Sequence, residues 1–203
     1  MDNCWLIRLV SAPGPSTPGD ARAELLAWNT EAVDAPELHE RLEHLSFLVG
    51  TWRGLGVVGY PTITEQRYEQ EVVFGHDGRP FLSYESRAWI IDEAGERVRP
   101  AARESGFWRP GIMPRDVEVL LAHPTGIVEV YVGEVVFHKI ELRTDVVART
   151  ETAKPVTALH RLYGLVEGDL AYAIDMAAMG EPLQSHLSAR LSRVDDPISA
   201  GTP

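Results

Sequence analysis

The chain has 203 residues, a formal net charge of −11 at pH 7, and an ordinary globular composition with 44% hydrophobic and 24% charged residues. A chain this acidic repels phosphate backbones, so nucleic-acid binding is not expected. No apolar run approaches the roughly 20 residues that a membrane-spanning helix needs, so no membrane role is expected. The length suits one domain with tails.

The single cysteine, Cys4, cannot form an intrachain disulfide, so nothing indicates an oxidising compartment. The N-terminal sequence lacks the basic start and long apolar core of a secretory signal, and we therefore expect a cytoplasmic protein. Residues 1–20 are rich in Pro, Gly and Ser, which predicts a flexible tail. A second short tail is expected over residues 196–203.

Residues 21–48 are expected to form a helical lead-in. Pro36 follows Asp34 closely, as at the first turn of a helix with Asp34 as its N-cap. A helix over about residues 35–47 would place four leucines on one apolar stripe: Leu38, Leu42, Leu45 and Leu48.

From residue 49 to 195, short β-branched and aromatic runs alternate with turn sequences. We expect ten strands, at about residues 50–59, 65–75, 80–91, 102–110, 117–122, 127–137, 140–149, 157–166, 169–178 and 184–194. Consecutive strands without intervening helices predict an antiparallel meander, which protects its edges by closing. The expected fold is therefore all-β, a ten-stranded antiparallel up-and-down β-barrel behind a short helical segment. A two-sheet sandwich is the alternative. A barrel of this size has room for one small ligand.

Three segments of the chain carry a family resemblance. One is the G-x-W-x-G-x-G pattern, followed by residues 59–63, and it is formed by Gly50, Trp52, Gly54 and Gly56. Glycines at alternate strand positions allow a sharp bend or a close approach of another backbone. The second segment spans residues 76–84 and 104–109, and the third comprises Lys154, residues 161–164 and residues 186–191. Over roughly residues 42–194 the chain resembles the nitrobindins, haem-binding barrels similar to fatty-acid-binding proteins.

The resemblance implies one haem b per chain, with His186 on the last strand as the axial iron ligand and with Thr62 and Lys154 at the haem. Haem needs only one protein nitrogen, so a lone histidine is sufficient. By strand alternation His186 shares a face with Ser188 and Arg190, and that face could be lumen or solvent. As a ligand, its other ring nitrogen should donate to a carbonyl or a carboxylate.

Other histidines have weaker claims to bind a ligand. His76 and His123 lie beside turns and are expected at the surface. No histidine pair has metal-ligand spacing with nearby cysteines or carboxylates, so a zinc site is not expected.

The resemblance also implies a reaction, the isomerisation of peroxynitrite to nitrate at ferric haem, together with nitric oxide binding. The protein would scavenge or sense reactive nitrogen species, and no catalytic group beyond the haem iron is expected. The expected partners are small molecules, and a homodimer is left open. Two alternatives stay open: a haem-free carrier of a lipid or small hydrophobic ligand, and a nitric oxide sensor that docks a protein through its N-terminal segment.

Overall fold

A computed structural model describes residues 36–194 of the chain. The two expected tails, residues 21–35 of the lead-in and the N-cap expected at Asp34 lie outside the described residues. Within residues 36–194, no helix is long and apolar enough to cross a membrane.

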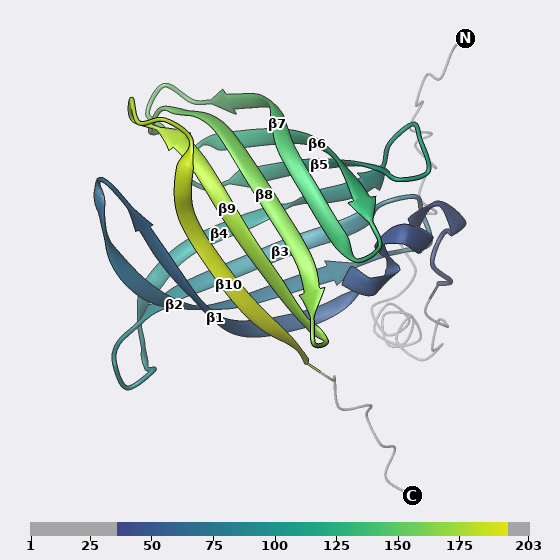
Figure 1. Ribbon diagram of the computed structural model, residues 1–203, viewed down its shortest axis with the longest axis horizontal. Coiled ribbons are helices and arrows are strands. Elements are labelled where there is room, and N and C mark those ends of the chain that lie inside the picture. The colour runs from purple at the N-terminus through teal and green to yellow at the C-terminus, as the bar shows by residue number, and fades with distance from the viewer. Residues whose placement is uncertain (1–35, 195–203) are drawn as a thin grey trace, which may run out of the picture. The chain divides into compact units, whose positions relative to one another are not determined.

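Ten antiparallel strands close into one barrel (Figure 1). Each strand pairs with the next one in sequence, and the last pairs with the first from Thr51–Val194 to Val58–Leu187. The expected up-and-down barrel is therefore confirmed, and the two-sheet sandwich is excluded. The strands are β1 (Gly50–Tyr60), β2 (Ile63–Gly75), β3 (Leu82–Ile91), β4 (Arg97–Pro110), β5 (Asp116–His123), β6 (Ile127–Val136), β7 (Lys139–Arg149), β8 (Val156–Val166), β9 (Asp169–Ala178) and β10 (Gln184–Val194).

Most strand bounds agree with the prediction within a residue or two. The exception is β4, which begins at Arg97 rather than at about residue 102. Its first residues pair only with the end of β3, because the ladder between β4 and β5 starts at Ser105. The β3–β4 hairpin therefore extends beyond β5 at this end of the barrel.

The described part of the lead-in forms one short helix, which begins later than predicted. It is a 3-10 helix, η1 (Glu40–Leu48), and its N-cap is His39, whose side chain accepts a hydrogen bond from the Arg41 backbone N–H. A 3-10 helix has about three residues per turn, so side chains three apart lie on one face. That spacing fits the three fully buried leucines, Leu42, Leu45 and Leu48.

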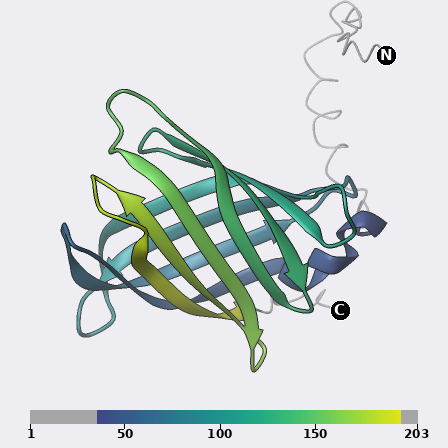
Figure 2. The same ribbon diagram turned by 45° about the horizontal axis from the view of Figure 1, so that its top comes forward.

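The helix η1 lies at one end of the barrel (Figure 2), and large buried side chains fill the interior there. The indole of Trp52 is buried here, and its Nε1 donates a hydrogen bond of 2.8 Å to the Leu48 carbonyl. The ring of Trp108 packs edge-on against that of Phe74, with centroids 5.4 Å apart. Because these large side chains occupy the interior at this end, any ligand space has to lie toward the other end.

The glycines of the G-x-W-x-G-x-G pattern lie where β1 meets β10. A Cβ at Gly54 would collide with the carbonyl oxygen of Arg190, and one at Gly56 would collide with the Tyr68 ring. Gly50 has a φ of 125°, a conformation that favours glycine. The pattern therefore serves the close packing of the seam between the first and last strands.

Candidate functional site

The end of the barrel opposite η1 opens into a cavity of about 610 Å³. Small-molecule sites typically measure about 300–1,000 Å³. The β1–β2, β3–β4, β5–β6, β7–β8 and β9–β10 connections surround its mouth, as the up-and-down order requires (Figure 1). Near the mouth the walls are mostly apolar, with side chains that include Ile63, Ala88, Ile90, Ile127, Val156, Ile174, Met176 and Leu187. This is the space that a ligand of the barrel would occupy.

His186 lines this cavity because of a β-bulge in β10. In the ladder with β9, Ser185 pairs with Asp175 and Leu187 pairs with Ile174, so His186 is the extra residue between them. A bulge re-aims a side chain that alternation would have placed elsewhere. Both His186 and the adjacent Leu187 therefore line the cavity. All seven histidines lie within the described residues, and His186 is the one among the residues that line this cavity.

The imidazole of His186 is held in one tautomer. Its Nδ1 lies 3.1 Å from the carbonyl oxygen of Gly59. A carbonyl can only accept, so Nδ1 carries the proton and the lone pair is on Nε2. Burial lowers the pKa of His186 below its ordinary value, more than the hydrogen bond to Gly59 raises it, so the neutral ring is favoured at pH 7. A haem-ligating imidazole is expected to donate from its other nitrogen to a carbonyl or a carboxylate. The Gly59 carbonyl is that acceptor in the structure.

The other residues expected at the haem take different positions. Lys154, in the β7–β8 connection, lines the mouth of the cavity and is exposed. Thr62 is exposed in the turn between β1 and β2, and it is not among the residues that line the cavity. The edge of Tyr60 packs against the His186 ring with centroids 5.5 Å apart.

The floor of the cavity is polar. Tyr68 and Tyr172 lie with their hydroxyls 2.9 Å apart, and Tyr172 donates to the Gln70 side chain. Gln70 in turn donates from Nε2 to the Ser86 hydroxyl over 2.8 Å. Burial raises the pKa of both tyrosines, which therefore stay neutral at pH 7. Each of these groups lies deeper along its strand than the apolar wall.

A buried ion cluster completes the floor. The Arg161 side chain is 2% exposed, and its Nη1 and Nη2 each donate to Glu104 over 3.0 Å. Nη2 also donates to Glu129 over 3.0 Å, and Nε donates to the Tyr131 hydroxyl over 2.7 Å. Burial alone would raise the pKa of both carboxyls, but the charge of Arg161 lowers it, for Glu129 to about 2. Both carboxylates are therefore ionised at neutral pH.

His123 belongs to this cluster, so its expected exposure is wrong. Its side chain is 15% exposed, and its Nε2 lies 3.2 Å from Glu129. Burial lowers the pKa of His123, but the neighbouring Glu129 and Glu104 outweigh it and raise the pKa overall. His76 is also partly buried rather than exposed. The clue in the sequence was Glu129, a charged residue between Ile127 and Tyr131 at an inward position of β6.

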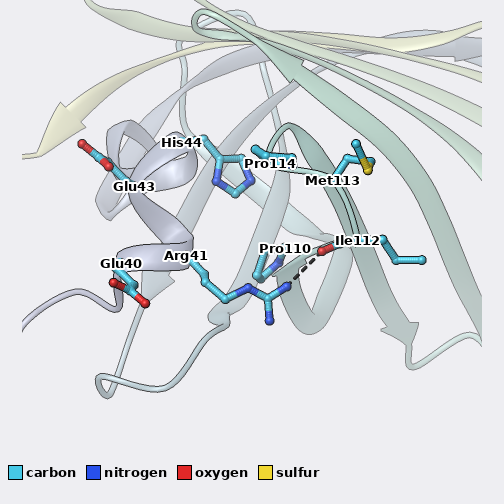
Figure 3. A pocket seen from close by; sticks show the side chains of 9 residues that line it. Glu40, Arg41, Glu43, His44, Pro110, Ile112, Met113 and Pro114 are labelled. Atoms are coloured by element: carbon cyan, nitrogen blue, oxygen red, sulfur yellow. Dashed lines mark hydrogen bonds between the residues drawn. The ribbon is translucent and has the colours of Figure 1, made fainter.

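A second pocket, of about 500 Å³, lies at the other end of the barrel (Figure 3). It is a surface hollow between η1 and the β4–β5 turn, bridged by a 3.0 Å hydrogen bond from Arg41 to the Gly111 carbonyl. Its lining comprises Glu40, Arg41, Glu43, His44, Pro110, Gly111, Ile112, Met113 and Pro114. None of the residues predicted to bind haem lines this pocket.

Comparisons with known proteins agree with this architecture. A family model described as "THAP4-like, heme-binding beta-barrel domain" matches residues 41–193. The chain is 57% identical over 156 residues to a "Peroxynitrite isomerase" of Nocardioides sp., covering 77% of this chain and 94% of that protein. It is 49% identical over 174 residues to a "Ferric nitrobindin-like protein" of Thermobifida fusca, covering 78% of this chain and 97% of that protein.

A solved structure shares the fold. The crystal structure of Rv2717c from M. tuberculosis superposes with a TM-score of 0.71 at 40% sequence identity, covering 78% of this chain and all of that one. A match over three quarters of the chain to the family model, together with relatives of about 50% identity, is sufficient to assign the family. The chain therefore belongs to the THAP4-like haem-binding β-barrel domains, the nitrobindin family that its motifs predict.

Proposed function

We propose that the barrel binds one haem b in the cavity at its mouth, with His186 Nε2 as the axial iron ligand. The observation that carries this proposal is the bond from His186 Nδ1 to the Gly59 carbonyl, which leaves Nε2 as the free lone pair on the cavity-lining ring. Iron ligation needs a neutral imidazole, and a metal-bound histidine commonly donates its other N–H to such a carbonyl. The depressed pKa of His186 favours the required form.

The residues around the mouth fit the rest of the porphyrin. An apolar wall suits the ring, and Lys154 at the rim would hold a propionate. Thr62, exposed in the adjacent β1–β2 turn, would reach the haem edge. One imidazole ligand leaves the sixth position of the iron open to a small molecule.

The reaction that we propose is the isomerisation of peroxynitrite to nitrate, the activity for which several relatives of about 50% identity are named. Bound ferric haem would supply the iron centre at which peroxynitrite rearranges. The chain's part is to hold that iron by one nitrogen and to shield it with an apolar wall. We also infer that the reduced form binds nitric oxide at the same open position.

The polar floor argues against a fatty-acid carrier. A carrier that buried a fatty-acid carboxylate at this floor would need a free cation there. Arg161 is the buried cation here, and it is already bonded to both Glu104 and Glu129. A further carboxylate at this floor would be repelled by the two that are present.

The test is a titration of the haem-free protein with hemin. Wild type should saturate at one hemin per chain with a Soret band, and stopped-flow mixing should show that only the haem-loaded form accelerates peroxynitrite decay. His186→Ala should lose stoichiometric binding while keeping its circular dichroism and melting temperature. His160→Ala is the matched control, because His160 pairs with Glu141 and Asp175 and does not line the cavity. Full haem occupancy in His186→Ala would refute the axial assignment.

A further inference from the structure

Arg99 stands at the rim of the same cavity. It lies in the part of β4 that extends beyond β5, and it pairs in register with Ile90 of β3. Both Arg99 and Ile90 line the cavity. A bulge follows, because Ala88 pairs with Ala102 and Trp89 pairs with Pro100, which leaves Ala101 as the extra residue. Arg99 is therefore on the inner face of the mouth although its strand is exposed.

The guanidinium of Arg99 has no acidic partner. Its Nη2 donates to the Gln66 side-chain oxygen over 3.0 Å, and its Nη1 donates to the Pro100 carbonyl over 3.4 Å. Within residues 36–194, no carboxylate oxygen lies within 4.0 Å of it. A guanidinium has five N–H donors, so these two neutral contacts leave most of them free.

Neighbouring arginines of β4 behave differently. Arg97 pairs with Glu69 at 2.6 Å and lies over the Trp89 ring, and Arg103 faces Glu85 at 3.4 Å. Neither lines the cavity. Of these three arginines, only Arg99 faces the cavity, and only Arg99 lacks a carboxylate partner within residues 36–194.

The mouth is consequently cationic in an acidic chain. Arg99 of β4 and Lys154 of the β7–β8 connection both line it, and neither is paired with a carboxylate in the described part of the chain. A dianionic ligand with an apolar body would place its body against the wall and its two charges at this rim. Haem, with two propionates on one edge, has that chemistry.

We propose that Arg99, oriented by Gln66, binds a haem propionate and so provides the second cationic contact beside Lys154. The inference rests on the proposed function, because it assigns a subsite of the same ligand. Arginine suits the role, since its planar fork can bind a carboxylate through two parallel hydrogen bonds, which an ammonium cannot do.

The test measures haem loss from the loaded protein to an excess of apomyoglobin. Arg99→Gln should release hemin about 3- to 10-fold faster than wild type, the range for one partly exposed charge-assisted contact. Arg99→Lys should fall between the two, because it keeps the charge but loses the fork. Arg103→Gln is the matched control, the same change on the same strand at a side chain outside the cavity, and it should match wild type.

Haem dimethyl ester separates charge from packing. With both propionates esterified, Arg99→Gln and wild type should release the ligand at equal rates. Equal hemin release by Arg99→Gln and wild type would overturn the inference, as would an unchanged rate ratio with the ester. A wild type that gives no Soret band with hemin would instead overturn the proposed function, and this inference with it.

Discussion

Arg161 holds together the polar groups beneath the ligand cavity. It bonds to Glu104, Glu129 and Tyr131, and both carboxylates depend on its charge to stay ionised in a buried place. A buried ion pair adds little net stability by itself, but removing one partner leaves an uncompensated buried charge. The cluster is therefore more sensitive to single substitutions than the exposed ion pairs on the barrel's outer face.

Arg161→Met should lower the free energy of unfolding by about 3–5 kcal/mol, because two carboxylates would then share a buried space without the charge of the arginine. Urea denaturation at pH 7 measures it. Arg53→Met is the control: Arg53 also pairs with a glutamate, Glu71, but its side chain is 54% exposed, and the loss should stay below about 1 kcal/mol. Equal losses in the two variants would contradict the role given to Arg161.

His123 should make stability depend on pH above about 6.5. Its pKa in the folded protein is raised above the ordinary value of 6.5, so its protonated form stabilises the fold. That contribution is complete below pH 6.5 and is lost as the pH rises through the folded-state pKa. His186, with a lowered pKa, acts in a different window, because its contribution is lost as the pH falls below 6.5.

The prediction is that His123→Gln flattens the decline in stability above pH 6.5 and leaves the slope below it unchanged. Melting temperatures of wild type and variant between pH 5 and 9 provide the comparison. A variant whose decline above pH 6.5 is as steep as that of wild type would show that His123 is not protonated in the fold.

At the level of the elements, the candidate haem site depends on the seam between β1 and β10. β1 contributes the Gly59 carbonyl and β10 contributes His186, so the geometry of the imidazole depends on how closely these strands pair. Gly54 lies in the same ladder and has no space for a side chain against the backbone at Arg190. A wider seam would weaken the pairing and move the carbonyl away from the ring.

Gly54→Ala should destabilise the barrel by about 1–3 kcal/mol, as overpacking commonly does, and should also weaken hemin binding. Thermal unfolding and a hemin titration measure the two effects. In Gly164→Ala the added methyl group in β8 would find its nearest neighbouring atom 3.8 Å away, and both quantities should stay close to wild type. Comparable losses in the two variants would show that the effect does not come from the close packing at the seam.

Strands were more predictable than the site because turns and alternation are local signals. The ten strands follow from apolar runs between turn residues, and their order follows from the need to close the sheet. Strand alternation alone does not show whether His186 faces the lumen or the solvent. The extra residue at the β10 bulge reverses the face of the sheet on which the preceding residues lie. The leucine spacing predicts a helix in the lead-in, and leucines three apart fit the 3-10 helix that forms.

At the scale of the whole molecule, contacts between residues far apart in the sequence could not be predicted. Arg161 meets Glu104 and Tyr131 across many residues, and no spacing rule links partners on different strands of a closed sheet. The family resemblance predicts His186, Lys154 and Thr62 as haem-binding residues. It leaves Arg99 out, because the arginine's inward direction depends on the Ala101 bulge and its lack of a counter-ion depends on the three-dimensional arrangement of the acidic residues.

Because the barrel closes by pairing β1 with β10, the cofactor pocket exists only once synthesis of the chain is nearly complete. A nascent polypeptide that ends before β10 has neither the imidazole nor an intact wall, even with the other strands in place. If haem binds at the proposed site, its loading would therefore follow synthesis of β10, and a protein released early by the ribosome would be unable to retain it. On that proposal, only molecules that contain the last strand would become pigmented.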